Sequence, residues 1–343
     1  MSSSPGRRPL STTPTLATVA AAAGVSPSTV SRVVNRSAPV SEEHRVRVEE
    51  VVARLGYVPN RAARSLVTRR TGAIALVVRE TVEFGVTDPY LSGMAVMASH
   101  ALSGTGNHLV LMVARDDEEH RSVGNYVRSG HVDGVILVSG HVGDPLPRQL
   151  LAARVPLVIG GRPPDPLEGA CWVDVDNVGG GRLAAERLLA SARRCVAAVS
   201  GPVDMSAAVD RLAGFRSVLA GAGLDQSLVA HGTFTRASGE QAMTELLARE
   251  PGIDGVFAAS DVTAVGAIRA LTAAGRRVPE DVAVIGFDDV ELARYTTPPL
   301  TTVRQPSAEQ ARVMVESLLA QLRGEPTPAP VVLPTELVVR SSG

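Results

Sequence analysis

The stretch AAAGVSPSTVSRVVN, residues 21–35, joins two helical patterns through a short turn at residues 24–26. Apolar residues before the turn recur at the spacing of one helix face, and Gly24 can adopt the left-handed conformation that often follows a helix. After the turn, Ser26 is a typical N-cap, and Pro27 suits the first helical position because an N–H there would have no intrahelical partner. The stretch therefore predicts two short helices separated by a tight turn.

A third helix is expected over residues 42–55, with Ser41 as its N-cap and a glycine at its end. Three short helices with a tight turn between the first two are typical of a helix-turn-helix, whose second helix enters the major groove of DNA. In that helix the valines face inward, so Ser28, Ser31 and Arg32 face outward, and an arginine there can reach the O6 and N7 atoms of guanine. The alternative for this pattern alone is a generic three-helix bundle with a solvated polar face.

Charge is distributed unevenly along the chain. Residues 1–70 hold eleven arginines and four glutamates, a balance of 11 − 4 = +7, which leaves −8 for the rest given the net charge of −1. A basic head on an acidic body indicates that the head meets a polyanion such as DNA. All 34 basic residues are arginine, which excludes a P-loop lysine, Schiff-base chemistry and a Ser-x-x-Lys nucleophile.

The chain has 343 residues, of which 45% are hydrophobic, enough for more than one compact unit. No apolar run reaches the roughly 18 residues that span a membrane. Residues 1–14 are expected to be a disordered leader, and they lack the apolar stretch of a secretory signal. We therefore expect a cytoplasmic protein with no membrane partner. The two cysteines and seven scattered histidines lack metal-site spacing, so neither a metal nor another cofactor is expected.

From residue 72 onward, short apolar strands such as AIALVV (73–78) and VAVIGFDD (282–289) alternate with helical segments. This alternation predicts a parallel sheet covered by helices. Because the cycle restarts near residue 194, we expect two doubly wound lobes with a ligand cleft at the carboxyl ends of their strands. Charged residues at those ends suit a polyhydroxy ligand, although any one of them could instead be a helix cap or a loop ion pair. They are Asp88, Arg162, Asp176, Arg211, Asp261 and Asp288.

The segments TLATVAAAAGVSPSTVSRVVN (15–35) and YVPNRAARSL (57–66) resemble, without a gap, the head and hinge of the lactose-repressor (LacI/GalR) family of bacterial transcription regulators. The resemblance implies that a short hinge helix orders on DNA and inserts Leu66 into the central step of a palindromic operator; the alternative is a simple linker. One departure is Thr18, where the family usually has aspartate. Bases are expected to be read by Pro27, Ser28 and Arg32, and further DNA contacts to come from Thr15, Ser26, Thr29, Ser31, Asn35, Asn60 and Ala63.

The body resembles the effector domain of the same family, which is periplasmic-binding-protein-like, most specifically in RLAGF (211–215) and VPEDVAVIGFDD (278–289). The resemblance implies that Arg211 and Asp288 contact the ligand from the second lobe, and that Phe234 stacks on a sugar ring. Gly161 stands where some members carry a ligand-binding aspartate, which leaves the identity of the ligand open. The expected effector-binding residues are Asp88, Tyr90, Arg162, Arg211, Phe234, Asp261, Asp288 and Gln305.

The expected fold is therefore an α/β chain with a three-helix helix-turn-helix head at 15–58, a hinge helix and linker at 59–71, and a two-lobed, doubly wound parallel-sheet effector domain at 72–343. Lobe 1 is expected at about 72–172 and 304–330, and lobe 2 at about 173–303 and 331–343. The expected function is a transcriptional regulator, in the first instance a repressor, that binds palindromic operator DNA as a homodimer and is controlled by a sugar-like small molecule.

Two alternatives remain at this point. One is a co-repressed regulator of the same fold that responds to a purine or nucleoside. The other is a nucleotide-dependent enzyme, because Gly179-x-Gly181-x-x-Ala184 imitates a dinucleotide-binding fingerprint. That pattern falls late, at the expected crossover between lobes, and no base, nucleophile or metal constellation accompanies it, so we expect no enzyme.

Overall fold

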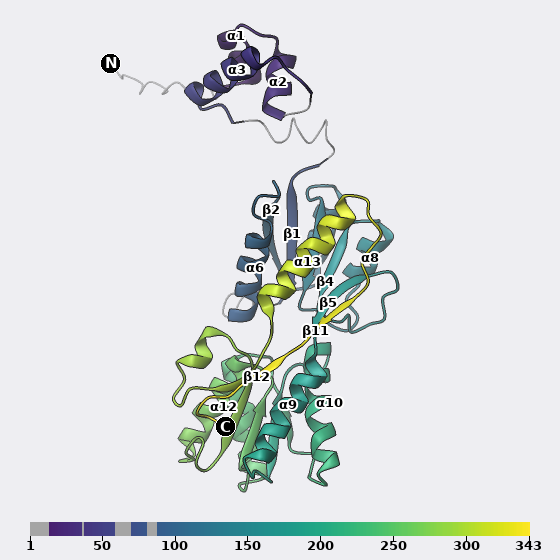
Figure 1. The fold of residues 1–343 in the computed structure, drawn as a ribbon. Coiled ribbons are helices and arrows are strands. Elements are labelled where there is room, and N and C mark those ends of the chain that lie inside the picture. The colour runs from purple at the N-terminus through teal and green to yellow at the C-terminus, as the bar shows by residue number, and fades with distance from the viewer. Residues whose placement is uncertain (1–13, 36–37, 59–69, 81–87) are drawn as a thin grey trace, which may run out of the picture. The chain divides into compact units, whose positions relative to one another are not determined.

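The computed structural model describes residues 14–35, 38–58, 70–80 and 88–343 (Figure 1). The chain divides into two compact units, Met1–Thr71 and Gly72–Gly343, here called the head and the body. Most of the expected leader and of the expected hinge lies outside the described residues. Among the residues that are described, no helix combines the length and the apolar character needed to cross a membrane.

The head consists of α1 (Leu16–Ala23), α2 (Pro27–Asn35) and α3 (Glu42–Leu55). A capping box opens α1, because the Thr15 and Thr18 hydroxyls each accept the other residue's backbone N–H, at 3.2 and 2.7 Å. Gly24 follows α1 in the left-handed conformation, with φ 66°. The predicted helix-turn-helix is confirmed. Its core is formed by Val19, Ala20, Ala23, Val30, Val48, Val51 and Tyr57.

Lobe 1 of the body is a six-stranded parallel sheet in the order β11-β5-β4-β3-β1-β2, with helices on both faces (Figure 1). Successive residues of β1 alternate between these faces: Ile74 and Leu76 pack with α6 and α13, and Ala75 and Val77 pack with α7 and α8. The strands are β1 (Ala73–Arg79), β2 (His108–Ala114), β3 (Gly134–Val138), β4 (Leu157–Gly160), β5 (Cys171–Val175) and β11 (Val331–Leu333), and the helices are α6 (Pro89–Ala101), α7 (Asp117–Arg128), α8 (Leu146–Ala152) and α13 (Ser307–Leu322).

Lobe 2 has a second six-stranded sheet in the order β12-β10-β9-β8-β6-β7, parallel except for the β10–β12 pair. Val196 and Ala198 of β6 pack toward α9 and α10, whereas Ala197 and Val199 pack toward α11 and α12. The strands are β6 (Val196–Ser200), β7 (Val229–His231), β8 (Gly255–Ala258), β9 (Ala283–Asp288), β10 (Thr301–Arg304) and β12 (Glu336–Val338), and the helices are α9 (Asn177–Ala190), α10 (Ser206–Gly221), α11 (Arg236–Arg249), α12 (Asp261–Ala273) and the 3₁₀ turn η1 (Glu291–Arg294).

The chain passes between the lobes after β5, after β10 and between β11 and β12 (Figure 1). The sequence placed the first and last passages near Val173 and Val331, but these two residues pair with each other inside the sheet of lobe 1. The passages therefore fall later, after Val175 and after Leu333. The difference arises because the pattern of a short apolar strand does not reveal which sheet it joins.

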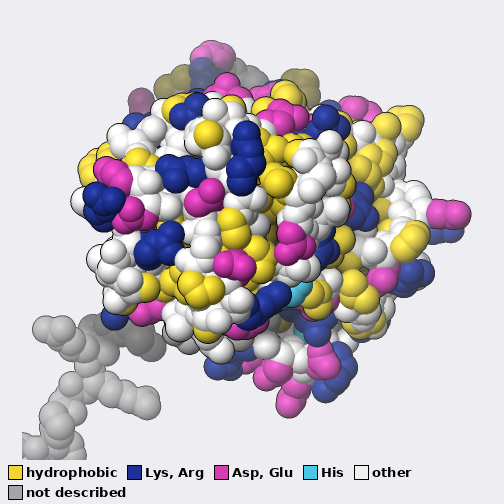
Figure 2. All heavy atoms as spheres, turned by 90° about the horizontal axis from the view of Figure 1, so that it is seen from below, with side chains coloured by type: hydrophobic (Ala, Val, Ile, Leu, Met, Phe, Trp, Pro, Cys, Tyr) yellow, Lys and Arg dark blue, Asp and Glu magenta, His cyan; other side chains and the backbone are white. Residues whose placement is uncertain are grey.

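The face of the molecule seen in Figure 2 mixes charges of both signs. On the face seen in Figure 2, basic and acidic side chains lie side by side rather than gathering by sign. Exposed i,i+4 pairs in lobe 2, such as Arg277 with Asp281 at 2.6 Å, belong to this kind of surface and contribute little to stability. The face in Figure 2 therefore offers no broad basic area that would bind DNA.

Helices α9 and α10 approach each other closely at two glycines. A Cβ on Gly181 would lie 2.0 Å from the Arg211 carbonyl oxygen, and a Cβ on Gly214 would lie 2.0 Å from the Val178 carbonyl oxygen. The glycine pattern that imitated a dinucleotide fingerprint thus includes a helix-packing contact, and this contact fixes the position of α10, the helix that carries Arg211.

Replacing Gly214 with alanine should lower the free energy of unfolding of the body by about 1–3 kcal/mol, because the added methyl group overlaps the Val178 carbonyl. Gly221→Ala is the matched control at the end of the same helix, where a Cβ has no neighbour within 4 Å, and it should be neutral or slightly stabilising. Urea unfolding followed by circular dichroism measures both variants. Equal unfolding midpoints would contradict this account of the helix contact.

Candidate functional site

The outer face of α2 carries the predicted DNA-reading residues. Ser28 and Arg32 are exposed. The Ser26 hydroxyl lies 2.7 Å from the Ser28 hydroxyl and 2.8 Å from that of Thr29, and it also accepts the Thr29 backbone N–H at 3.1 Å. These bonds hold small hydroxyl groups at the start of the helix, where they can bind phosphates or base edges.

Further along α2, the Asn35 side chain donates to the Ser31 hydroxyl at 3.2 Å. Arg45 of α3 pairs with Glu49 at 2.7 Å, whereas Arg32 forms no ion pair with any of the described residues. The exposed guanidinium of Arg32 is therefore ready for an acceptor outside the head. The remaining predicted DNA contacts, Asn60, Ala63 and Leu66, lie outside the described residues.

The body contains a cleft lined by residues of both lobes, with about 790 Å³ of empty space including the part open to solvent. A concave site of this kind between two lobes is typical of small-molecule binding sites. Every predicted effector-binding residue except Asp261 lines it: Asp88, Tyr90, Arg162, Arg211, Phe234, Asp288 and Gln305.

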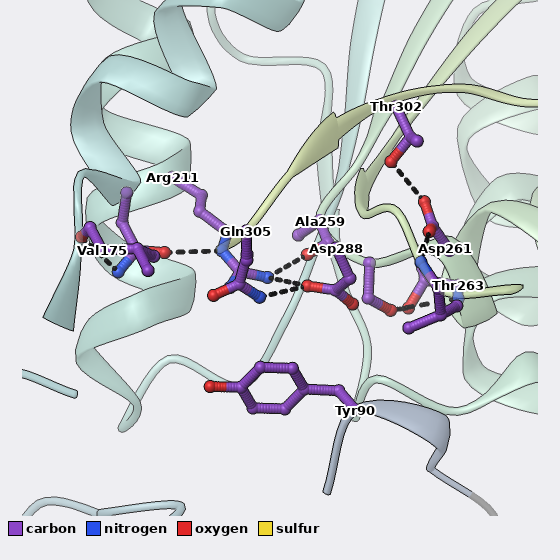
Figure 3. A network of polar contacts seen from close by, with 12 residues as sticks. Tyr90, Val175, Arg211, Ala259, Asp261, Thr263, Asp288, Thr302 and Gln305 are labelled. Atoms are coloured by element: carbon purple, nitrogen blue, oxygen red, sulfur yellow. Dashed lines mark hydrogen bonds and ion pairs between the residues drawn. The ribbon is translucent and has the colours of Figure 1, made fainter. Parts of the chain in front are cut away.

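Arg211 of α10 is buried at the wall of the cleft and held from several sides (Figure 3). Its Nε donates to Asn177 Oδ1 at 2.8 Å, and its Nη1 donates to the Ala259 carbonyl at 2.6 Å. The guanidinium also lies over the Phe287 ring, 3.7 Å from the ring centroid. Backbone, amide and ring contacts thus fix the plane of the guanidinium before any ligand binds.

Asp288, at the end of β9, is the anionic partner of Arg211. Its Oδ1 lies 3.4 Å from Arg211 Nη1 and accepts Gln305 Nε2 at 2.6 Å (Figure 3). Burial raises the pKa of Asp288 to about 7, and the Arg211 charge opposes this rise. The cleft therefore holds a carboxyl group that changes its charge near neutral pH.

Two more carboxyl groups of lobe 1 line the cleft. Asp88 is the N-cap of α6 and accepts the backbone N–H groups of Tyr90 at 2.7 Å and Leu91 at 3.3 Å. Asp174 of β5 accepts the backbone N–H of Arg162 at 3.0 Å. Burial raises the pKa of both carboxyl groups. Backbone N–H groups hold these two carboxyl groups in place, and their oxygens make this wall of the cleft rich in hydrogen-bond acceptors.

Arg162 and Phe234 lie on opposite lobes of the cleft. Arg162 lines the cleft, but its guanidinium forms a two-pronged ion pair with Asp210 of α10, at 2.8 and 3.0 Å. The structure therefore shows Arg162 joining the two lobes, a contact that the sequence did not reveal. Phe234 lies in the left-handed region, with φ 58°, and its ring is 5.9 Å from the Arg211 guanidinium. The ring lines the cleft, and its stacking on a sugar stays a prediction.

Asp261 does not line the cleft, which corrects the expectation from its position at a strand end. It is fully buried as the first residue of α12, and its carboxylate accepts the Thr302 hydroxyl at 2.5 Å and the Val290 N–H at 2.9 Å (Figure 3). Asp176, the other charged residue noted at a strand end, is an exposed N-cap of α9. Both carboxylates satisfy backbone donors rather than a ligand.

Some lining residues escaped sequence reasoning. Asp174 is a polar residue inside an otherwise apolar strand, CWVDV, and that interruption was a usable signal. Gln310 of α13 had no such signal; it accepts the Tyr90 hydroxyl at 3.0 Å and donates to the Val173 carbonyl at 3.0 Å. The other polar lining residues that were not expected are Ser139, Asn177, Ser206 and Ser260.

Comparisons with known proteins agree with this geometry. Residues 15–60 match the family described as bacterial regulatory proteins, lacI family, and residues 181–343 match the periplasmic binding protein-like domain. The HTH-type transcriptional regulator CelR of Thermobifida fusca is 49% identical over 334 residues, which cover 96% of this chain and 98% of that protein. The ribose operon repressor of Bacillus subtilis is 31% identical, with 91% and 93% covered.

Two solved structures are similar over the full chain. The transcriptional regulator CelR–cellobiose complex has a TM-score of 0.77 at 46% identity, covering 96% of this chain and 100% of that one. The lac repressor dimer bound to operator and the anti-inducer ONPF has a TM-score of 0.84 at 28% identity, covering 96% and 98%.

A helix-turn-helix head and a two-lobed body with a ligand cleft define a DNA-binding regulator. The chain belongs to the lacI family of bacterial regulatory proteins, as the sequence resemblance predicted. It is accordingly a transcriptional regulator and not an enzyme.

The raised pKa of Asp288 predicts a pH-dependent stability difference between the wild type and Asp288→Asn. Between pH 4 and 7 the folded protein holds a proton on Asp288 that the unfolded chain has lost, so the wild type loses stability as the pH rises across this window. The isosteric amide lacks this penalty. The free energy of unfolding of Asp288→Asn minus that of the wild type should therefore increase from pH 5 to 7, by at most about 1.4 kcal/mol per pH unit. Above pH 7 this difference should level off.

Urea unfolding of both proteins at pH 5, 6, 7 and 8 measures this difference. A difference that stays constant over the series would show that the Asp288 carboxyl titrates as it does in the unfolded chain.

Proposed function

We propose that this regulator is a repressor that binds a palindromic operator as a homodimer, in the cytoplasm, and that a neutral sugar bound in the cleft controls its affinity for the operator. The observation that carries the proposal is the buried pair of Arg211 and Asp288, held by Gln305 and facing the cleft. A guanidinium and a carboxyl group held in fixed positions can donate to and accept from neighbouring hydroxyl groups on one ring.

The charge of the cleft favours a neutral ligand over an anionic one. The carboxyl groups of Asp88, Asp174 and Asp288 line it, whereas the guanidinium of Arg162 is already paired with Asp210. A sugar phosphate would bring a dianion toward these carboxylates, and such like-charge contacts are unfavourable at low dielectric. Hydroxyl groups, in contrast, donate well to carboxylates.

The similarity to the CelR–cellobiose complex narrows the class of sugar. We infer that the effector is a glucose disaccharide such as cellobiose, and that Phe234 and Tyr90 contact the apolar faces of its rings. The Tyr90 hydroxyl is anchored by Gln310, which leaves the ring in a fixed place on the lobe 1 side of the cleft.

The exposed edge of the lobe 1 sheet is an argument for the proposed dimer. Strand β2 is the last strand of its sheet, and Leu111 on it and Val96 on the neighbouring helix α6 are exposed. An exposed edge strand with apolar side chains invites pairing with another chain. The lac repressor with a similar fold is a dimer on its operator, and a single head is small for a specific DNA interface, so a two-fold pair of heads suits a palindromic site.

Arg32→Ala should weaken binding to the operator by about 1–3 kcal/mol and relax the preference at one base-pair position in each half-site, because it removes a guanidinium that can bind guanine. Arg47→Ala in α3 is the matched control; it removes the same charge from the head but only an exposed pair with Glu43. Selection of binding sites from random DNA by each variant measures the preference. Identical selected motifs for wild type and Arg32→Ala would exclude base reading by Arg32.

Asp288→Asn should weaken cellobiose binding by at least about tenfold and abolish the effect of cellobiose on operator binding, because a ligand changes DNA affinity only through its contacts in the body. Asp176→Asn is the control, since it changes the same charge at an exposed helix cap that asparagine also suits. Calorimetric titration and fluorescence anisotropy on the selected operator measure the two effects.

Failure of wild type to bind cellobiose would refute the choice of sugar. Binding by wild type together with an unchanged response in Asp288→Asn would place the effector outside this part of the cleft.

A further inference from the structure

The turn that carries Asp288 has an unusual backbone. Asp288 and Asp289 are consecutive residues with positive φ, 113° and 55°. Residues other than glycine rarely adopt such backbone angles. A protein keeps these angles only where the surrounding contacts hold the backbone in place. Residues held in this way cluster at ligand-binding sites. The contacts that hold this turn are therefore relevant to how Asp288 faces the cleft.

Asp261 holds the turn from beneath. Its Oδ2 accepts the backbone N–H of Val290, the residue that follows the two strained positions, at 2.9 Å. Its Oδ1 accepts the Thr302 hydroxyl at 2.5 Å (Figure 3). One residue thus connects the start of α12, the end of β9 and the strand β10.

The space for this carboxylate is created by a glycine. A Cβ on Gly286 in β9 would lie 2.3 Å from Asp261 Oδ1. A buried carboxyl group is expensive unless its oxygens are bonded, and here each oxygen has a donor. Asp261 is fully buried and does not line the cleft.

The opposite side of the turn is held independently. The buried Asp289 carboxylate accepts Arg304 Nε at 2.7 Å and Arg340 Nη2 at 2.5 Å. These ion pairs do not involve Asp261, so the turn keeps one anchor when the other is weakened.

We infer that Asp261 is a positioning residue for effector binding: through Val290 and Thr302 it fixes the turn so that the Asp288 carboxylate faces the effector, which Asp261 itself never touches. The inference rests on the proposed function of Asp288 and extends it to a residue one layer deeper. It predicts that a change at Thr302, outside the cleft, weakens effector binding.

Thr302→Val tests this inference with the full-length protein, because valine has the size of threonine but no hydroxyl. Thr302→Ser, which keeps the hydroxyl, should restore the behaviour of the wild type. The comparison variant is Thr301→Val, the neighbouring residue in β10, which is equally buried. Its hydroxyl donates to the Gly343 carbonyl at 3.0 Å and accepts the Arg340 backbone N–H at 2.9 Å instead of bonding Asp261. All four proteins are compared by thermal unfolding, calorimetric titration with cellobiose, and hydrogen exchange of the peptide that contains Val290.

We expect Thr302→Val to weaken cellobiose binding about tenfold and to speed exchange of the Val290 amide severalfold. Thr302→Ser and Thr301→Val should change the affinity by less than about twofold, even where they lower the unfolding temperature as much as Thr302→Val does. Equal affinities for Thr302→Val and Thr301→Val would overturn the inference, because buried-hydroxyl loss alone would then explain both.

A second variant and a measurement without effector complete the test. If Thr302→Val fails to fold, Asp261→Asn replaces it, because an amide offers one acceptor oxygen for two donors; affinity and exchange equal to the wild type would then overturn the inference. The exchange measurement needs no effector. If the wild type does not bind cellobiose, the choice of sugar fails, and an unchanged Val290 exchange rate in Thr302→Val still overturns the inference separately.

Discussion

The burial of the Arg211 guanidinium beside the Asp288 carboxylate is the constraint on which the body of this regulator depends. A charge removed from water needs fixed partners, and Arg211 has an amide, a carbonyl and an aromatic ring in addition to the carboxylate. The amide comes from the start of α9, the carbonyl from the residue after β8, and the ring and the carboxylate from β9. The close approach of α9 and α10 at Gly181 and Gly214 brings the first of them, Asn177, within reach. The packing of these two helices thus determines the geometry within the cleft.

The same constraint explains the chemistry of the cleft. Because Nε and Nη1 of Arg211 are already bonded and Arg162 is paired with Asp210, carboxyl groups supply much of the hydrogen-bonding capacity that remains on the cleft walls. Such a surface suits ligands that donate many hydrogen bonds and carry no negative charge. The head has a surface of the opposite kind. Its second helix packs its valines toward the core and exposes small hydroxyl groups and Arg32, which can bind a polyanion. One chain therefore combines a surface for an anion with a cleft that disfavours anions.

Much of this could be predicted from the sequence, and the exceptions have physical causes. The glycine, serine and proline of the first turn each have a local conformational preference, so the boundaries of α1 and α2 followed from residues 15–35 alone. Asp288 could be located because it ends an apolar strand. Arg211 lies inside α10 rather than at its start, and the family resemblance of RLAGF located it. Asp261 stands at an equally recognisable junction of strand and helix but points into the interior, because Gly286 on a neighbouring strand leaves room there. That choice depends on tertiary packing, which no local pattern contains.

The partners of Arg162 and Tyr90 were equally beyond sequence reasoning. Asp210 and Gln310 lie on helices that the chain reaches only after crossing between the lobes, so their neighbours depend on the topology of the whole body. The crossings themselves were displaced by a few residues because β5 and β11 are short strands that could have joined either sheet.

The three passages of the chain between the lobes have a mechanical consequence. They leave the lobes from neighbouring strands, since β5 pairs with β11 and β10 pairs with β12. A single link would allow sliding, twisting and separation, whereas three links side by side resist shear and torsion and leave bending as the soft coordinate. A ligand that alters the bend at the carboxyl ends of the strands therefore displaces their amino ends along a defined arc. One of those ends is the start of β1, where the polypeptide arrives from the DNA-binding head.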